Sequence, residues 1–384
     1  MKIALVHDYL REYGGAERVV EVLHEMYPEA PLYTSFVDWS SFAKAPAGKV
    51  ELFKSWDIRT SWVQKFWLIK KFISPLRFLA PWIWRSFDLS EYDVVISSSG
   101  WFMCRGVAVS QKKPLHICYI HHPPRNLYGY ATGSDWQKYW PVRVYGTIIN
   151  FFLRHYDWET AQAVDFFIAN SKETARRVQK FYRRESTVIY PPIESTNHLI
   201  NKSSNQQIST HKNYFLSVGR LTYAKRVDLA IRAAYKLKLP LKIVGSGKEE
   251  AYLRSIAGPT VEFLGSVSDE ELSRLYAGAK ALIFCALDED FGMVPVEAQA
   301  AGTPVIALAQ GGVLETIIDG KTGVLFQKPE VEELAKAIQQ FNTLPMQRND
   351  CIAQAKKFSK ERFKKEMKLF VEKAYQEASP SNNP

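Results

Sequence analysis

Two glutamates, Glu289 and Glu297, lie in a stretch of the second half that has the features of a ligand site. The stretch 287–298 reads LDEDFGMVPVEA and follows an apolar, strand-like run. A helix beginning near residue 292 has unpaired N–H groups and partial positive charge at its start, which suit an anion or sugar oxygens. Gly292 lets the backbone approach a ligand closely. Glu289 then lies at the mouth of this helix and Glu297 more than one turn inside. The two carboxylates are therefore placed to hold different hydroxyl pairs of an extended ligand.

Apolar runs typical of buried strands alternate with amphipathic, helix-like runs on both sides of this stretch. The strand-like runs are 2–7, 93–98, 115–120, 165–170, 215–219, 241–244, 261–264, 281–285 and 305–307, and the helix-like runs include 16–26, 172–181, 227–237 and 294–301. This alternation predicts an α/β fold with a parallel, doubly wound sheet in each half. Ligands of such sheets bind at the carboxyl ends of the strands, so two such units predict a site in a cleft between them.

The length of 384 residues suits two domains. We predict a first domain over 1–190 and a second over 214–358. Segment 191–213 opens with two prolines and continues Ser/Asn/Gln-rich, so it reads as the linker. Residues 359–378 read as a helix with apolar side chains at helical spacing, which we expect to pack back on the first domain.

Composition is ordinary for a globular protein, with 46% hydrophobic and 23% charged residues. The four cysteines are scattered, without metal-ligand spacing, and Cys118 and Cys285 lie in strand-like runs as small buried hydrophobes. No secretory signal and no run of 18 apolar residues is present. These features favour a reduced, cytoplasmic protein.

Segment 52–87 interrupts the alternation and carries seven Lys/Arg, one Asp and five of the ten tryptophans. Its centre places Phe66, Trp67, Ile69, Phe72 and Ile73 beside Lys65, Lys70 and Lys71. This mixture indicates peripheral contact with a membrane surface, at the inner face of the cell membrane. The alternative is a set of buried aromatics with solvated lysines. The net charge of +10 also suits anionic partners, but no nucleic-acid recognition motif appears.

The stretch 287–298 resembles the E-x7-E motif of retaining GT-B glycosyltransferases of family four. Blocks 300–305 and 311–315 are similar to the next motifs of that family. Residues 218–221 with Lys225 resemble its diphosphate-binding loop, and 14–17 resemble its N-terminal glycine loop. Segment 119–125 (YIHHPPR) resembles a histidine-containing loop of O-antigen mannosyltransferases in the family. The resemblance implies the GT-B fold, with two Rossmann-like doubly wound domains facing across a cleft.

The resemblance also implies roles for individual residues. Arg220 and Lys225 bind the diphosphate, whose charge grows as the leaving group departs. Glu297 holds the ribose, Glu289 the transferred sugar, and His121 contacts that sugar or the transition state. The implied catalytic residues are Glu289, His121, Arg220 and Lys225; the implied donor-binding residues are Gly15, Arg220, Lys225, Gly245, Asp290, Phe291, Gly292, Met293, Val294 and Glu297; Glu17 and Arg125 are implied for the acceptor.

The function that this resemblance implies is retaining transfer of a hexose from a nucleoside-diphosphate sugar to a lipid-linked or polysaccharide acceptor. GDP-mannose is the favoured donor and a UDP-sugar the alternative. The sugar nucleotide is a substrate, so no cofactor is implied, and no metal, since Arg220 and Lys225 replace it. Residues 288–290 also fit a D-x-D metal motif, but the architecture that uses it lacks a second Rossmann unit. A nucleotide-sugar epimerase of the same fold and a non-catalytic, membrane-attached binding protein are the alternative functions.

Overall fold

The central strands of the first half are mostly apolar and fully buried, because helices cover both faces of their parallel sheet. The computed structural model describes residues 1–42, 48–107, 114–133, 135–193 and 213–378. These form two units, of which the first contains 1–129, 137–192 and the chain's C-terminal helix. Its sheet has the order β3-β2-β1-β4-β5-β6-β7, and each neighbouring pair is parallel. The strands are β1 (Ile3–His7), β2 (Leu32–Thr34), β3 (Ile58–Thr60), β4 (Val94–Ser99), β5 (Leu115–Ile120), β6 (Phe166–Ala169) and β7 (Thr187–Val188).

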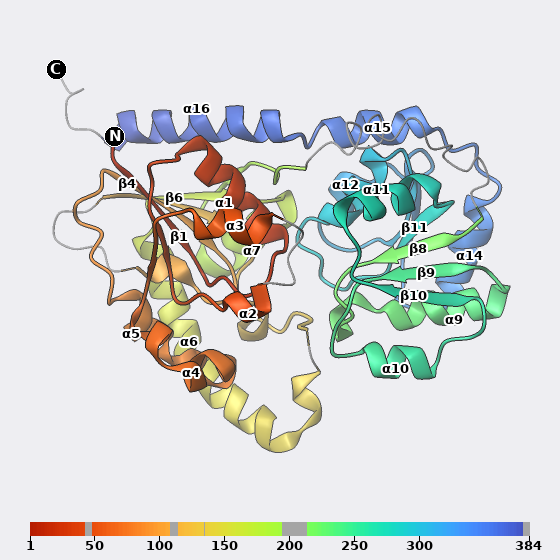
Figure 1. The fold of residues 1–384 in the computed structure, drawn as a ribbon, viewed down its shortest axis with the longest axis horizontal. Helices are drawn as coiled ribbons and strands as arrows, with labels where there is room; N and C mark the ends of the chain where they lie inside the picture. The colour runs from red at the N-terminus through yellow and green to blue at the C-terminus, as the bar shows by residue number, and fades with distance from the viewer. Residues whose placement is uncertain (43–47, 108–113, 134, 194–212, 379–384) are drawn as a thin grey trace. The chain divides into compact units, whose positions relative to one another are not determined.

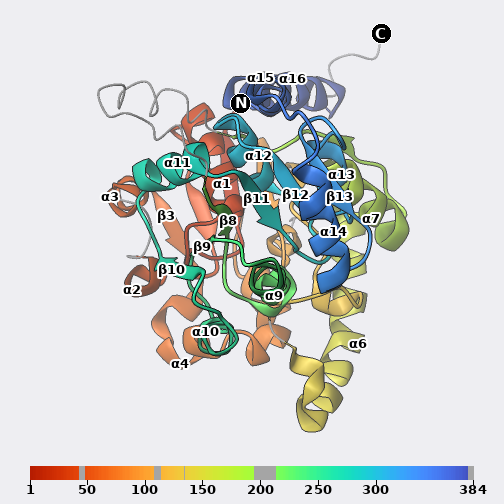
Figure 2. The ribbon, with the colours of Figure 1, turned by 90° about the vertical axis from the view of Figure 1, so that its right-hand side faces the viewer.

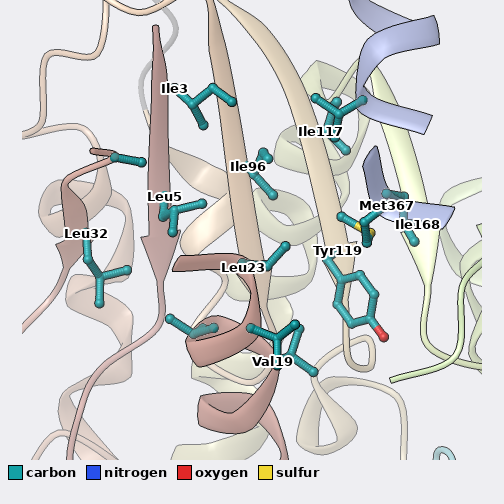
Figure 3. Close-up of a cluster of buried hydrophobic side chains, with 14 of the residues drawn as sticks. Ile3, Leu5, Val19, Leu23, Leu32, Ile96, Ile117, Tyr119, Ile168 and Met367 are labelled. Carbon is teal, nitrogen blue, oxygen red and sulfur yellow. The ribbon is translucent and has the colours of Figure 1, made fainter. Parts of the chain in front are cut away.

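Helices from both ends of the chain cover one face of this sheet. Helix α1 (Gly15–Met26) places Val19 and Leu23 on the strands, as Figure 3 shows. Helix α16 (Lys360–Ala378) buries Met367 and three other residues in the same core (Figures 1 and 3). The other helices of the first half are α2 (Trp39–Phe42), α3 (Lys49–Lys54), α4 (Trp67–Lys71), α5 (Ala80–Trp84), α6 (Trp140–Ala163) and α7 (Lys172–Tyr182), with short 3-10 turns η1 (Trp62–Lys65), η2 (Pro75–Leu79), η3 (Cys104–Gly106), η4 (Arg125–Leu127) and η5 (Trp136–Lys138).

A buried ion pair joins α6 to the turn η3 in the first unit. Arg105 of η3 contacts Asp157 of α6, and both side chains have no exposed surface. The Tyr128 hydroxyl donates to Asp157 at 2.7 Å, and Arg105 donates to the Tyr182 hydroxyl at 3.1 Å. Further hydrogen bonds to both charges offset part of the cost of removing them from water.

Segment 52–87 is only partly an interruption of the fold. It supplies the edge strand β3, and Val63, Ile83 and Trp84 are buried in a second core of the first unit. Ile73 is also buried, at 4% exposure, so our prediction that it belongs to a surface patch is wrong. Its neighbours Phe66, Trp67 and Phe72 are exposed. The segment therefore combines buried aromatics with an exposed aromatic surface.

The second unit contains residues 130–136 and 193–359 and a sheet of order β10-β9-β8-β11-β12-β13. All of its neighbouring strands are parallel. Helices α9 and α14 contribute side chains to one hydrophobic core of this unit, and α11 and α12 contribute side chains to a second core (Figure 2). The strands are β8 (Phe215–Val218), β9 (Leu241–Val244), β10 (Val261–Gly265), β11 (Ala281–Phe284), β12 (Val305–Leu308) and β13 (Gly323–Phe326); the helices are α9 (Val227–Leu237), α10 (Glu250–Ser255), α11 (Asp269–Gly278), α12 (Met293–Ala300), α13 (Val313–Thr316), α14 (Val331–Phe341) and α15 (Arg348–Lys356), with the 3-10 turn η6 (Tyr223–Lys225).

Both sheets therefore have the doubly wound order, which confirms the predicted fold class of two Rossmann-like domains. The strand order reverses between β1 and β4 in the first sheet and between β8 and β11 in the second. Ligands of open α/β sheets bind at the carboxyl ends of strands at such a switch point. Of the predicted linker 191–213, residues 194–212 lie outside the described residues. In the described part of the chain, no helix is long and apolar enough to cross a bilayer.

Candidate functional site

The switch point of the second unit brings together two residues that are 64 positions apart. Lys225 ends η6, which follows β8, and Glu289 lies in the loop between β11 and α12. The Lys225 Nζ donates a hydrogen bond to Glu289 Oε2 at 2.7 Å, and the two side chains are 22% and 15% exposed. Arg220 lies two residues after β8 and is exposed. A half-buried lysine and an exposed arginine at this position suit an anionic ligand.

Two glycines impose the conformation of the Glu289 loop. A Cβ at Gly311 would lie 2.1 Å from the Glu289 carbonyl oxygen, and Gly311 has φ +72°. The Gly312 N–H donates to that same oxygen at 2.8 Å. Asp288 adopts a left-handed conformation, and its carboxylate accepts hydrogen bonds from the Ala131 N–H and the Gln310 side chain. The loop that carries Glu289 is therefore fixed by contacts of its backbone and of the Asp288 carboxylate with residues 310–312 and Ala131.

Helix α12 begins where the sequence predicts it. Gly292 is its N-cap with φ +89°, a conformation that side chains rarely adopt. Phe291 is buried against Phe358, with ring centroids 5.3 Å apart, and this contact holds the residue that precedes the helix cap. Met293 and Val294 at the start of the helix are half-buried, and Asp290 is 8% exposed.

Glu297 lies in the second turn of α12 and is 8% exposed. Its Oε2 accepts a hydrogen bond from the Tyr276 hydroxyl of α11 at 3.0 Å. Tyr276 is itself almost fully buried and fixes the position of this carboxylate. Sequence reasoning missed Tyr276, because no motif links it to the E-x7-E pair. Ribose binding by Glu297 stays a prediction.

The Gly245-x-Gly247 pair packs the loop after β9 against the loop after β8. A Cβ at Gly245 would lie 2.0 Å from the Gly219 carbonyl oxygen, and one at Gly247 would lie 2.2 Å from the Leu221 carbonyl oxygen. Both glycines are therefore required by close backbone approach. Gly245 thus lies beside the segment that carries Arg220, and its contact with the donor stays a prediction.

The switch point of the first unit carries a buried chain of polar side chains. Ser98 of β4 has its Oγ 2.7 Å from His121 Nε2 and 3.2 Å from His7 Nδ1. The other ring nitrogen of His7 lies 3.4 Å from Glu17 Oε1. All four side chains are at most 9% exposed. The strands β1, β4 and β5 and helix α1 thus position a Glu17–His7–Ser98–His121 chain.

The Glu17 carboxylate at the end of this chain raises the pKa of His7. Burial alone lowers the pKa of a histidine, but the hydrogen bond and charge of Glu17, with the charge of Asp8, outweigh burial here. The other Glu17 oxygen accepts from the Gly14 N–H at 2.9 Å, at the start of α1. Gly15 is the first residue of that helix. Glu17 therefore positions His7, and its predicted acceptor contact stays a prediction.

The adjacent residue Asp8 holds the loop after β4. Its carboxylate accepts hydrogen bonds from the backbone N–H groups of Gly100, Phe102 and Cys104 at 2.8–3.1 Å. Sequence reasoning missed His7, Asp8 and Ser98, although all three stand at strand ends. A polar residue at the end of an apolar strand is the signal that could have found them.

The remaining predicted residues of the first half have distinct surroundings. His122 Nδ1 lies 3.0 Å from the Pro123 carbonyl oxygen, so the two adjacent histidines have different partners. Arg125 begins η4 and is half-buried. The four cysteines are free and buried, as predicted for Cys118 and Cys285. Among the described residues, no group of three or more His, Cys, Asp or Glu side chains is arranged to hold a metal.

Family comparison covers most of the chain in two parts. Residues 13–197 match the family model described as Glycosyltransferase Family 4. Residues 200–358 match the model described as Glycosyl transferases group 1. Both parts of the chain therefore match glycosyltransferase families.

Curated relatives and solved structures agree with this placement. The chain is 34% identical to the uncharacterized glycosyltransferase MJ1607 of Methanocaldococcus jannaschii, over 36% of this chain and 40% of the relative. It is 28% identical to the D-inositol 3-phosphate glycosyltransferase of Nocardioides sp., over 47% of this chain and 46% of the relative. The chain thus spans less than half the length of these curated relatives.

Two solved structures share the fold over nearly the whole chain. Anabaena Alr3699/HepE in complex with UDP has a TM-score of 0.69 and 18% identity, covering 97% of this chain and 100% of that one. Sucrose-phosphate synthase from Thermosynechococcus elongatus has a TM-score of 0.72 and 17% identity, covering 98% and 100%. At this identity the likeness shows the fold alone.

Proposed function

We propose that this glycosyltransferase is a retaining hexosyltransferase that uses a nucleoside-diphosphate sugar without a metal ion. The observation that carries the proposal is the Lys225–Glu289 pair at the switch point of the second sheet, with Arg220 two residues after β8. Cationic side chains at this point can neutralise the charge that develops on a departing diphosphate. In the same unit, the start of α12 offers N–H groups to sugar oxygens.

The Lys225–Glu289 pair also supports a way in which the donor is accepted. Lys225 neutralises Glu289 within the unit. A diphosphate offers Lys225 a second anionic partner, which leaves Glu289 oxygens available to sugar hydroxyls. Glu297, held by Tyr276, is proposed to bind the ribose, and Gly245 to lie near the nucleotide. His121, held by Ser98, is proposed to contact the transferred sugar.

GDP-mannose is the donor that the sequence favours, through its resemblance to mannosyltransferases in segments 119–125 and 287–298. The neighbouring HepE structure was solved with UDP and with UDP-glucose, so UDP-sugars belong in the same test. The proposed acceptor is a lipid-linked or polysaccharide glycan, which Glu17 and Arg125 are proposed to help place. We further propose peripheral attachment to the inner membrane face, because Phe66, Trp67 and Phe72 are exposed beside lysines.

The test is thermal unfolding with GDP-, UDP- and ADP-sugars, each with a chelator and with Mg²⁺ or Mn²⁺. A ligand at a hundred times its Kd stabilises the folded protein by about 2.7 kcal/mol. We expect stabilisation by one base in the presence of chelator, lost in Arg220→Ala. Transfer of the sugar to candidate acceptors is then measured with that donor. Stabilisation only with metal, or by no sugar nucleotide, would refute the proposal.

A further inference from the structure

Helix α6 exposes an apolar face that the sequence analysis did not identify. Its 24 residues bury only one side, which includes Gly146, Asn150, Leu153 and Asp157. At about 100° per residue, the side opposite them carries four large apolar residues. Their exposed fractions are 69% for Trp140, 47% for Val144, 54% for Ile148 and 65% for Phe151.

Exposed apolar side chains are concentrated here and in segment 62–82. Among the described residues, nine large exposed hydrophobics lie within 139–158, against five in the whole second unit. Scattered exposed hydrophobics are normal, but a contiguous apolar helix face marks an interaction surface. We call residues 62–82 and 139–158 together the α4–α6 surface.

The two parts of this surface are linked within the first unit. Arg77 of η2 donates to the Asn150 side chain at 2.6 Å, and the Tyr145 hydroxyl donates to the Pro75 carbonyl oxygen. Figures 1 and 2 both place α4 and the first half of α6 toward the lower edge of the first unit. The exposed residues of the first part are Trp62, Phe66, Trp67, Leu68, Phe72 and Trp82.

The accessible charges of the α4–α6 surface have a single sign. Residues 62–82 contain four Lys and Arg and residues 139–158 contain two, whereas the one carboxylate within these bounds, Asp157, is fully buried. On α6, Arg143 and Arg154 lie on the same flank of the apolar face, about 20° apart around the helix axis. Lys71 lies 5.7 Å from the centre of the Trp67 ring. An apolar stripe with a cationic flank is the pattern of a helix that lies in a membrane interface.

We infer that the α4–α6 surface docks onto an anionic lipid bilayer, with α6 lying in the plane of the interface. A second copy of the chain is a poorer occupant, because two surfaces of the same positive sign would repel each other. Acidic headgroups instead supply the complementary charge, and the acyl boundary takes up the apolar face. The inference deepens the proposed function, since it names the surface that brings the enzyme to a membrane-bound acceptor.

The experiment is co-sedimentation of the full-length protein with vesicles, in the absence of any sugar nucleotide. One set contains phosphatidylcholine and phosphatidylglycerol at three to one, and the other contains phosphatidylcholine alone. The variants are Ile148→Ser/Phe151→Ser, which removes apolar contacts, and Lys71→Gln/Arg143→Gln, which removes charge. Leu369→Ser on α16, whose side chain is 57% exposed, is the matched control.

We expect binding to the anionic vesicles and a partition coefficient reduced about tenfold or more in Ile148→Ser/Phe151→Ser. The charge variant should lose about tenfold on anionic vesicles, with little change on neutral ones, and its loss should shrink at high salt. Leu369→Ser should bind as the unchanged protein does. Stabilisation by the sugar nucleotide should survive in all variants, so failure of the donor site and failure of docking give different results.

Two outcomes would overturn the inference. One is equal vesicle binding by Ile148→Ser/Phe151→Ser and the unchanged protein, or no binding by either. The other is a dimer in solution, measured by light scattering, that Ile148→Ser/Phe151→Ser dissociates while no vesicle binding is seen. That second result would assign the surface to a second copy of the chain.

Discussion

Substitution of either partner in the Lys225–Glu289 pair should have opposite consequences for nucleotide binding. Lys225→Met removes the cation that is proposed to contact the diphosphate of the donor. In Glu289→Gln the lysine remains and loses its anionic partner, so it is more available to phosphate. If the pair serves only to stabilise the loop, both substitutions should instead weaken the protein and its ligand binding alike.

The geometry sets the size of the expected effects. The 2.7 Å Nζ–Oε2 hydrogen bond joins side chains that are 22% and 15% exposed, so the pair is mostly shielded from water. A hydrogen bond that involves a charged group contributes about 1.5–3 kcal/mol. Lys225→Met should therefore weaken binding of the nucleoside diphosphate by about 10- to 150-fold. Glu289→Gln should leave that affinity unchanged or improve it, and reduce turnover.

The assay is titration calorimetry with GDP and UDP, followed by turnover with the preferred sugar nucleotide. Lys236→Met is the control, because the Lys236–Glu332 pair lies on the exposed surface of the same unit. Its loss should leave binding and turnover unchanged. The double variant Lys225→Met/Glu289→Gln completes a cycle, in which coupling between the two sites is read directly.

Two results would refute this reasoning. If Lys225→Met bound the nucleotide as the unchanged protein does, the lysine would have no role at the diphosphate. If Glu289→Gln lost nucleotide affinity as strongly as Lys225→Met, the pair would be a structural element of the loop. In either case Arg220 alone would remain as the proposed phosphate contact.

Three further predictions concern the scaffold around the sites. The pKa of His7 is raised in the folded state, so its contribution to stability is present below about pH 6.5 and is lost as the pH rises through the folded pKa. In Glu17→Gln burial dominates instead and places the folded pKa of His7 below 6.5, so urea unfolding should show a stability that grows with pH in the range below about pH 6.5. Gly311→Ala places a Cβ against the Glu289 carbonyl at positive φ, and should cost about 1–3 kcal/mol and abolish donor stabilisation in thermal unfolding. Arg105→Met leaves a buried carboxylate uncompensated and should lower the free energy of unfolding by about 3–5 kcal/mol in urea titration.

The long apolar strands and the helices beside them could be predicted to within one or two residues. Strand β5 (Leu115–Ile120) and helix α9 (Val227–Leu237) have the predicted bounds. These segments are predictable because parallel strands buried on both faces leave continuous apolar runs. The three-residue strands β2 and β3 escaped prediction, since three residues carry no periodicity and their strand conformation depends on pairing with neighbours.

Helix α6 was missed for a different reason. Its inner side carries Gly146, Asn150 and Asp157, while Phe151 and Phe152 are exposed. The usual rule that the apolar stripe faces the core is therefore reversed along much of this helix. A helix that places polar side chains inward and aromatics outward violates the pattern on which sequence prediction depends, and such violations concentrate at functional surfaces.

Sequence motifs identified the residues of the candidate site better than their partners. The Glu289 motif and Lys225 were both found, but not the hydrogen bond between them, because contact across 64 positions follows from the sheet order. Glu17 was assigned to an acceptor, which stays a prediction, and its contact with His7 was not predicted. His7 and Ser98 belong to no motif, and the contact between them follows from the pairing of β1 with β4.

The switch point explains why each unit gathers polar residues at one place. Where the strand order reverses, the connections after β1 and β4 leave in opposite directions, as do those after β8 and β11. The ends of these strands are then left open to side chains instead of being covered by a crossover. Asp8 follows β1 and Glu289 follows β11, so each carboxylate lies beside the switch point of its own sheet. In the first unit the carboxylate is satisfied by backbone N–H groups, and in the second by a lysine side chain that a phosphate can engage. That difference in partner supports the proposal that the nucleotide binds in the second unit.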